Sequence, residues 1–139
     1  MGLTEMGTGE VVTVSQDDDI TSALEHMDSE GVGSVVIADG DEPMGIVTDR
    51  MIAMYLKDHG DMESVSVSDV MSEDLITIDE SASHFEALQM MSENGIRRIP
   101  VVENGGSLRG IITLDDLIVV MAAEMSNASD VIEQQAGRV

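Results

Sequence analysis

Hydrophobic and polar positions follow the same pattern twice along this chain. Residues 11–52 run in parallel with residues 75–117, at an offset of 64 positions that becomes 65 after one loop residue is gained. The segment GIVTDRMI at 45–52, for example, matches GIITLDDL at 110–117. A repeat of this length predicts a repeated structural unit. Two copies are too few for a solenoid, so we expect a closed pair in which each half covers the apolar face of the other.

The first copy is predicted to fold as strand, helix, strand, strand and helix. Ile20, Ala23, Leu24 and Met27 lie on one helical face, which predicts a helix that ends at Gly31. Acidic residues at 17–19 precede this helix, where they can cap its free N–H groups. Strands are predicted at 11–14, 35–38 and 45–47, and the second helix at 49–57.

The second copy repeats these elements. Ser83 and Glu86 fit a capping box at the start of its first helix, and Gly95 marks the end. Strands are predicted at 75–78, 99–102 and 110–112, and the last helix from Leu114 to about Ser126. The fold class is therefore α/β (α+β), with repeats at 3–57 and 70–126, a polar connector at 58–69 and a tail at 127–139. Val70 and Met71 are predicted to lead into the second copy. The tail either forms one more short helix or frays.

The formal net charge of -22 changes what this fold can bind. Twenty-eight acidic residues stand against six basic ones, so nucleic acid and anionic membrane surfaces are disfavoured as partners. The acidic residues are spread along the whole chain, which favours a protein of a high-salt cytoplasm, as in a halophilic archaeon. An ordinary acidic protein is the alternative. The chain has no cysteine, no signal peptide pattern and no apolar run long enough to cross a membrane, so we expect a cytoplasmic protein.

Three segments of the second copy resemble a known family. They are VMSEDLITI at 70–78, NGIRRIPVVENG at 94–105 and GIITLDDLI at 110–118. Together with their counterparts in the first copy they look like a tandem pair of CBS domains (cystathionine-β-synthase motifs), also called a Bateman module. The resemblance covers roughly residues 3–126 and suggests a stand-alone member of the family.

The resemblance implies a fold and a function. Two βαββα units would pack through their sheets with pseudo-twofold symmetry, and two such modules commonly pair into a disk-like homodimer, in a parallel or an antiparallel arrangement. Clefts between the repeats would bind an adenosine-containing ligand such as AMP, ADP, ATP, S-adenosylmethionine or NAD. Binding would regulate a partner protein that the sequence does not identify. No cofactor is required, although magnesium could accompany a nucleotide.

Thr113 and Asp116 are the most specific candidates for ligand contact. A carboxylate can accept two hydrogen bonds from a ribose diol, and a hydroxyl beside helix N–H groups suits a phosphate. The alternative is structural, because Thr113 can cap a helix whose first turn contains Asp116. In the first copy Met51 replaces Asp116. Since Met cannot bind a ribose diol, we predict unequal clefts, with the better one built around Asp116.

Arg97 and Arg98 are the candidates for phosphate contact, because guanidinium groups bind phosphate through paired hydrogen bonds. Ion pairing with the many carboxylates is the alternative. Gly33 and Ser34 stand at the matching positions of the first copy. The complete prediction for the better cleft is Thr77, Ile78, Arg97, Arg98, Ile99, Pro100, Thr113, Asp115 and Asp116. For the weaker cleft it is Thr13, Val14, Ser34, Val35, Thr48, Asp49 and Arg50.

Three function classes follow. The first is a non-catalytic regulator that binds an adenine nucleotide, and the second is a dimerisation scaffold with vestigial clefts. An enzyme comes third, because the sequence contains no acid–base pair or nucleophile motif. His26, His59 and His84 have no metal-ligand spacing, so no metal site is predicted.

Overall fold

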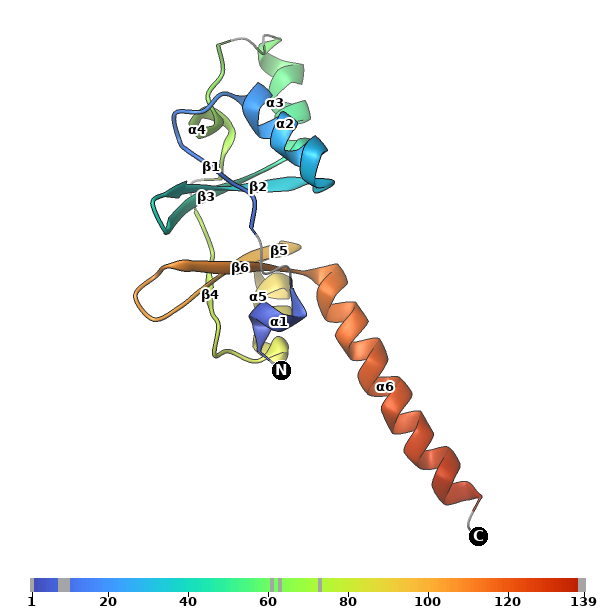
Figure 1. Cartoon of the computed structure of the whole chain (residues 1–139). Helices are drawn as coiled ribbons and strands as arrows, with labels where there is room; N and C mark the ends of the chain where they lie inside the picture. The colour runs from blue at the N-terminus through green and yellow to red at the C-terminus, as the bar shows by residue number, and fades with distance from the viewer. Residues whose placement is uncertain (1, 8–10, 61, 63, 73, 138–139) are drawn as a thin grey trace.

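The computed structural model describes residues 2–7, 11–60, 62, 64–72 and 74–137. It contains two three-stranded sheets, each with helices, and the sheets lie one above the other (Figure 1). The predicted α+β fold with two equivalent repeats is confirmed. The first sheet has the order β1 (Thr13–Val14), β2 (Ser34–Asp39) and β3 (Glu42–Thr48). The second has the order β4 (Ile78–Asp79), β5 (Arg98–Val102) and β6 (Leu108–Thr113).

The two sheets share their strand pairing in detail. In each, the first strand pairs in parallel with the second, and the second pairs antiparallel with the third. A register shift follows Ile37 in the first sheet and Val101 in the second, which are equivalent positions of the repeat. Both first strands are shorter than predicted. The strand β1 begins at Thr13, after Val11 and Val12, which line a cleft between the repeats, and β4 begins at Ile78.

The first helix of each repeat begins and ends at the predicted caps. In α2 (Ile20–Glu30), Asp19 accepts a hydrogen bond from the Ser22 N–H at 2.8 Å, and Gly31 ends the helix with φ 66°. In α5 (His84–Asn94), Ser83 accepts from the Glu86 N–H at 3.1 Å. The helix α3 spans Asp49–His59, two residues beyond its predicted end.

The last helix corrects the prediction for the C-terminal region. The helix α6 (Leu114–Ala136) is one continuous element of 23 residues, so it does not end near Ser126 and no separate tail follows there. Residues 127–136 contain neither Gly nor Pro, and they end in the helix-forming run EQQA. In Figure 1 the C-terminal part of α6 extends beyond the rest of the molecule. Every residue from Ala122 to Ala136 is exposed.

Each repeat has its own apolar core, and the chain crosses between the two cores at both ends of the first repeat. The helix α1 (Leu3–Met6) lies at the N-terminal end of the first repeat, yet its Leu3 is fully buried in the second core. Conversely, α4 (Val67–Val70), which the sequence did not predict, contributes to the first core. Val70 and Met71 also pack against the first core, although the sequence predicts that they lead into the second repeat.

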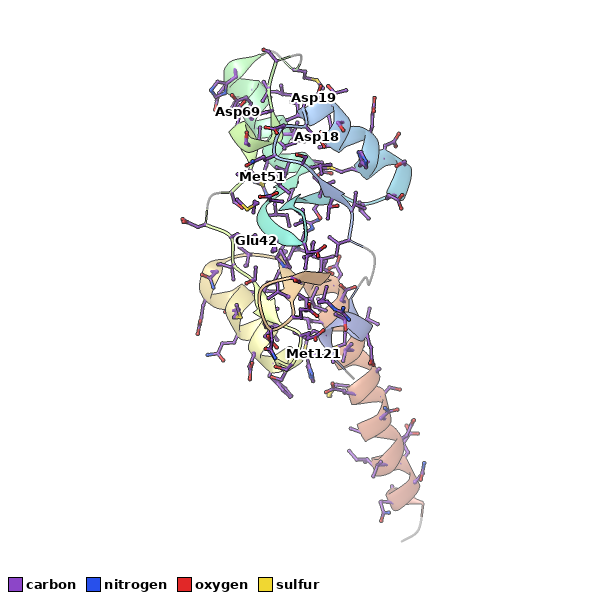
Figure 2. All side chains as sticks on the ribbon, turned by 60° about the vertical axis from the view of Figure 1, so that its left-hand side comes forward. Asp18, Asp19, Glu42, Met51, Asp69 and Met121 are labelled. Atoms are coloured by element: carbon purple, nitrogen blue, oxygen red, sulfur yellow. The ribbon has the colours of Figure 1, made fainter. Side chains whose placement is uncertain are left out.

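Backbone hydrogen bonds hold the connector to the first repeat. The Ile20 N–H donates to the Val65 carbonyl at 3.1 Å, and the Val67 N–H donates to the Asp18 carbonyl at 2.8 Å. Figure 2 shows Asp18, Asp19 and Asp69 at this end of the molecule. Their carboxylates accept hydrogen bonds from nearby backbone N–H groups, so acidic side chains shape the local structure here. Among the described helices, none has the length and apolar character needed to cross a membrane.

Candidate functional site

A cleft of about 160 Å³ lies between the two repeats. Its lining comes from both of them: Val11, Val12, Val32, Gly33, Ser34 and Val36 from the first, and Arg98, Ile111 and Thr113 from the second. The sequence-based grouping divides these residues between two clefts. Ser34 had been assigned to the weaker cleft and Arg98 and Thr113 to the better one, but all three line the same space.

One part of the cleft is an apolar wall. Val11, Val12 and Val32 supply it from the first repeat, and Ile111 from the second. These residues were not predicted as site residues, because in the sequence they read as ordinary strand and loop positions. Branched aliphatic side chains form a surface on which a flat heteroaromatic ring such as adenine can pack.

Arg98 brings a positive charge into this cleft. It is the first residue of β5 and is half-buried. A methyl group added at Gly33 would lie 3.5 Å from Arg98 Nη2 and 3.5 Å from Asp49 Oδ2, so both charged groups face the same glycine. Arg98 makes no ion pair with the carboxylates in the described part of the chain. Its guanidinium group is therefore available to an anionic ligand.

Arg97 has a different environment. Its side chain is 67% exposed, and its Nη2 lies 3.4 Å from Asp115 Oδ1. Arg97 therefore pairs with a carboxylate of the protein, whereas its neighbour Arg98 lines the cleft. A small hollow beside the cleft is lined by Arg97, Arg98, Thr113, Leu114 and Asp115.

Thr113 and Asp116 form a reciprocal capping box at the start of α6. The Thr113 N–H donates to Asp116 Oδ2 at 2.9 Å, and the Asp116 N–H donates to Thr113 Oγ1 at 3.1 Å. Oδ1 of Asp116 accepts no hydrogen bond from the described residues. The cap thus fixes the orientation of a half-buried carboxylate and leaves one of its oxygens for another donor.

The equivalent position of the first repeat lacks this carboxylate. Thr48 Oγ1 accepts a hydrogen bond from the Met51 N–H at 3.1 Å, so the helix cap is preserved. Met51 cannot return the second bond of the box. Asp49, one residue after the cap, accepts from the Arg50 N–H at 2.7 Å. The two repeats therefore differ in the polar side chains at the start of α3 and α6. The backbone conformation of the two capping residues, Thr48 and Thr113, is nearly the same.

Several predicted site residues belong to the cores. Val14 and Val35 are buried in the first core, and Ile78 and Ile99 in the second. Pro100 is also buried. Strand residues alternate between two faces, so Val35 and Ile99 point away from the cleft that Ser34, Val36 and Arg98 line. Pro100 follows Ile99 and therefore faces the other way, but it is not part of the cleft lining.

The remaining predicted residues lie outside the main cleft. Thr13 is exposed and borders an adjoining hollow, which shares Val11 and Val12 with the cleft and also includes His26 and Glu30. Arg50 borders a hollow on the outer face of α3. Thr77 is half-buried and is not part of the cleft lining.

No group of three or more potential metal-ligating side chains occurs among the described residues. One carboxyl outside the cleft, that of Asp79, has a pKa below its ordinary value. The Ser81 hydroxyl and the Ser81 backbone N–H both donate to Asp79 Oδ1, at 2.6 and 2.9 Å, and stabilise its charged form.

Comparison with known sequences supports the two-repeat architecture. The sequence profile of the CBS domain matches twice, over residues 3–58 and 67–123. An uncharacterized protein of Methanopyrus kandleri is 36% identical over 118 residues, which cover 84% of this chain and 60% of the relative. The CBS domain-containing protein YhcV of Bacillus subtilis is 35% identical over 122 residues, which cover 88% of this chain and 84% of the relative.

Solved structures share the fold. A signal-transduction protein with CBS domains from Burkholderia ambifaria superposes with a TM-score of 0.79 at 27% identity, covering 88% of this chain and 95% of the other. The CBS domain pair of protein MJ0100, solved in complex with 5′-methylthioadenosine and S-adenosyl-L-methionine, gives a TM-score of 0.80 at 20% identity. It covers 89% of this chain and 98% of the other. At that identity the second likeness shows the fold alone.

Proposed function

Because this chain belongs to the family of CBS-domain proteins, we propose that it is a non-catalytic regulatory module whose cleft between the repeats binds an adenosine-containing ligand. The observation that carries the proposal is the combination of groups in and beside one cleft. An apolar wall and Arg98 line the cleft together with Thr113, whose N–H donates to the carboxylate of Asp116, a residue outside that lining. These groups match the adenine, phosphate and ribose parts of a nucleotide. The complex of the MJ0100 domain pair supports the adenosyl class, since its two ligands share that group.

Ligand binding would change the distance between the repeats. The cleft volume of about 160 Å³ is smaller than the roughly 300–1,000 Å³ of ordinary small-molecule sites. We expect the cleft to widen when an adenosine enters it. A wider and a narrower form that bind ligand unequally are what a regulator needs to signal to a partner protein.

Calorimetric titration at molar KCl with AMP, ADP, ATP, NAD and S-adenosylmethionine tests this proposal. We expect at least one ligand to bind, and Asp116→Asn to weaken it by roughly 10- to 100-fold, because hydrogen bonds to a charged group contribute about 1.5–3 kcal/mol. Asn keeps an oxygen that can accept from the Thr113 N–H, so the helix cap is retained.

Met51→Ala is the matched control, because Met51 holds the equivalent position in the first repeat. It should leave the affinity within about twofold. Equal losses in both variants would contradict the predicted asymmetry. If none of the five ligands binds to the folded wild-type protein, the dimerisation scaffold becomes the better description.

The phosphate contact has its own test in a second pair of variants. Arg98→Gln is expected to weaken AMP and ATP by about 10-fold, the effect of losing one charge-assisted contact. Its effect on 5′-methylthioadenosine, which has no phosphate, should be negligible. Arg97→Gln is the control, since Arg97 is exposed and paired with Asp115. Equal weakening of AMP by both variants would place the phosphate nearer to the surface hollow than to the cleft.

A further inference from the structure

The helix α6 is much longer than its counterpart in the first repeat. The helix α3 has 11 residues and is followed by Gly60 with φ 69°, whereas α6 has 23 residues. At the repeat offset of 65 residues, Met125 of α6 stands where Gly60 ends α3. Figure 1 shows α6 extending alone past the rest of the molecule, beyond Met121, which Figure 2 labels. Residues 122–136, called the α6 extension below, are therefore an addition to the repeat.

An apolar stripe runs along α6 from the second core into this extension. One face of the helix has apolar residues at spacings of four, three, four and seven residues: Leu114, Ile118, Met121, Met125 and Ile132. These spacings are those of the a and d positions of a coiled coil. Leu114 and Met121 pack against the second core. Met125 and Ile132 continue the stripe outside it, where they are 72% and 68% exposed.

The α6 extension lacks the packing that normally stabilises a helix. Each of its residues is exposed. In water, isolated helices shorter than about 12–15 residues are only marginally stable, and in proteins most helix stability comes from the packing of an apolar face. Large apolar side chains that recur along one exposed face mark an interaction site. An a and d pattern packs best against another helix, whose side chains fit between its own.

The charge of the extension restricts which helix can cover it. The extension contains Glu124, Asp130 and Glu133 and no Lys, Arg or His. Glu124 Oε1 lies 3.0 Å from His84 Nε2, whereas Asp130 and Glu133 make no ion pair with the described residues. A second copy of the same surface would place acidic groups against acidic groups, and like charges in contact cost free energy. The charge therefore favours a basic helix.

The described part of the chain offers no such helix. Counting Asp and Glu against Lys and Arg, α3 is neutral, because Asp49 and Asp58 are balanced by Arg50 and Lys57. Each of the other described helices has an excess of acidic side chains. The complementary helix therefore belongs to another protein.

We propose that the α6 extension is the docking surface for a basic amphipathic helix of a partner protein. Apolar side chains of that helix pack on Met125 and Ile132, and its Lys or Arg side chains lie beside Asp130 and Glu133. Opposite charges also speed the encounter of the two surfaces. The proposal does not rest on nucleotide binding, since no residue of the extension lines the cleft between the repeats. Failure of the nucleotide titrations leaves it intact.

A synthetic peptide tests this docking on the full chain. The probe is a labelled peptide of about three heptads with Leu at the a and d positions and Lys at e and g, where like charges keep it from pairing with itself. A scrambled peptide of the same composition has the same charge and no apolar face. We expect the probe to bind in fluorescence anisotropy titrations, more weakly as KCl rises. The scrambled peptide should bind about tenfold more weakly or worse. Equal binding of both peptides, or binding of neither, overturns the proposal.

A pair of variants tests the apolar stripe. Met125→Gln combined with Ile132→Gln should weaken the probe about tenfold or more, because both apolar contacts are lost. Both side chains are exposed and Gln is a good helix former, so the fold is retained. Val119→Gln is the matched control: Val119 is 69% exposed on the same helix but lies off the stripe. It should leave the affinity within about twofold, and equal losses in both variants would contradict docking on this face.

Charge reversal tests the acidic side chains. Asp130→Lys combined with Glu133→Lys should weaken the probe about tenfold or more, with a larger effect at lower salt. Glu25→Lys combined with Glu30→Lys is the matched control, because it makes the same change in net charge at exposed positions of α2. An equal effect of the control would mean that the probe responds to net charge alone, which overturns the proposal.

Hydrogen exchange localises the bound probe. Amides of the α6 extension should exchange quickly in the free protein, because the segment has no packing partner, and more slowly in the complex. Amides of α3 should be unchanged. Absence of protection in the extension would place the probe elsewhere and overturn the proposal. So would a wild-type dimer that Met125→Gln with Ile132→Gln dissociates while the probe does not bind, because the surface would then pair two copies of this chain.

Discussion

Transfer from molar KCl to dilute buffer is expected to lower the midpoint of thermal unfolding by roughly 10 °C or more, the equivalent of about 3 kcal/mol for a domain of this size. The reason is the net charge of -22 on 139 residues. Unit charges 4 Å apart in water repel by about 1 kcal/mol. At 1 M salt the screening length falls to about 3 Å, which removes most of the repulsion between surface carboxylates.

The structure shows where part of this repulsion arises. Asp28 and Glu30 lie in the last turn of α2, which contains no basic side chain. Acidic groups there oppose the negative end of the helix dipole as well as each other. By contrast, Asp18, Asp19 and Asp69 accept hydrogen bonds that stabilise helix starts and turns. At low salt we therefore expect Asp28 and Glu30 to destabilise the fold, but not the carboxylates that accept hydrogen bonds.

A double variant separates these two kinds of carboxylate. Asp28→Asn with Glu30→Gln is expected to raise the unfolding midpoint in dilute buffer and to change it little at molar KCl. Asp19→Ala should instead lower the midpoint at both salt concentrations, because an N-cap contributes about 1 kcal/mol. The measurement is a pair of melting curves for each protein. Equal stability of the wild type at both salt concentrations would favour the ordinary acidic protein over the high-salt one.

Local sequence signals predicted most elements of this fold. Asp19 and Ser83 cap their helices, and Gly31 and Gly95 end them, because capping depends on groups within a few residues. The end of α6 was missed for a related reason. The polar stretch after Met125 resembles a loop in composition, but it contains no residue that breaks a helix.

Contacts between the repeats could not be predicted in the same way. The apolar faces of the two copies are nearly interchangeable, so the pattern does not tell which core receives α1 or α4. For the same reason, the sequence did not show that residues of both repeats line one cleft. Arg97 and Arg98 are adjacent, yet one is on the surface and one enters the cleft, because neighbouring residues at a strand start point in different directions.

The second large effect is expected on stability, because α1 packs into the core of the second repeat. Leu3→Ala should lower the free energy of unfolding by about 2–5 kcal/mol, the range for truncating a buried Leu. Leu3 is fully buried in the second core, and α1 contacts both β6 and α6. The backbone approach is close at the end of α1, where a side chain on Gly7 would collide with the Ile111 carbonyl. A short helix at the start of the first repeat therefore completes the core of the second repeat.

Urea denaturation at molar KCl measures this effect, and Glu5→Ala is its matched control on the same helix. Glu5 is exposed, so its removal should change the free energy of unfolding by no more than about 0.5 kcal/mol. Hydrogen exchange localises the loss: amides of β5 and β6 should exchange faster in Leu3→Ala than those of β2 and β3, because the cavity lies in the second core. A loss below about 1 kcal/mol, or equal acceleration in both sheets, would contradict the assignment of α1 to the second repeat.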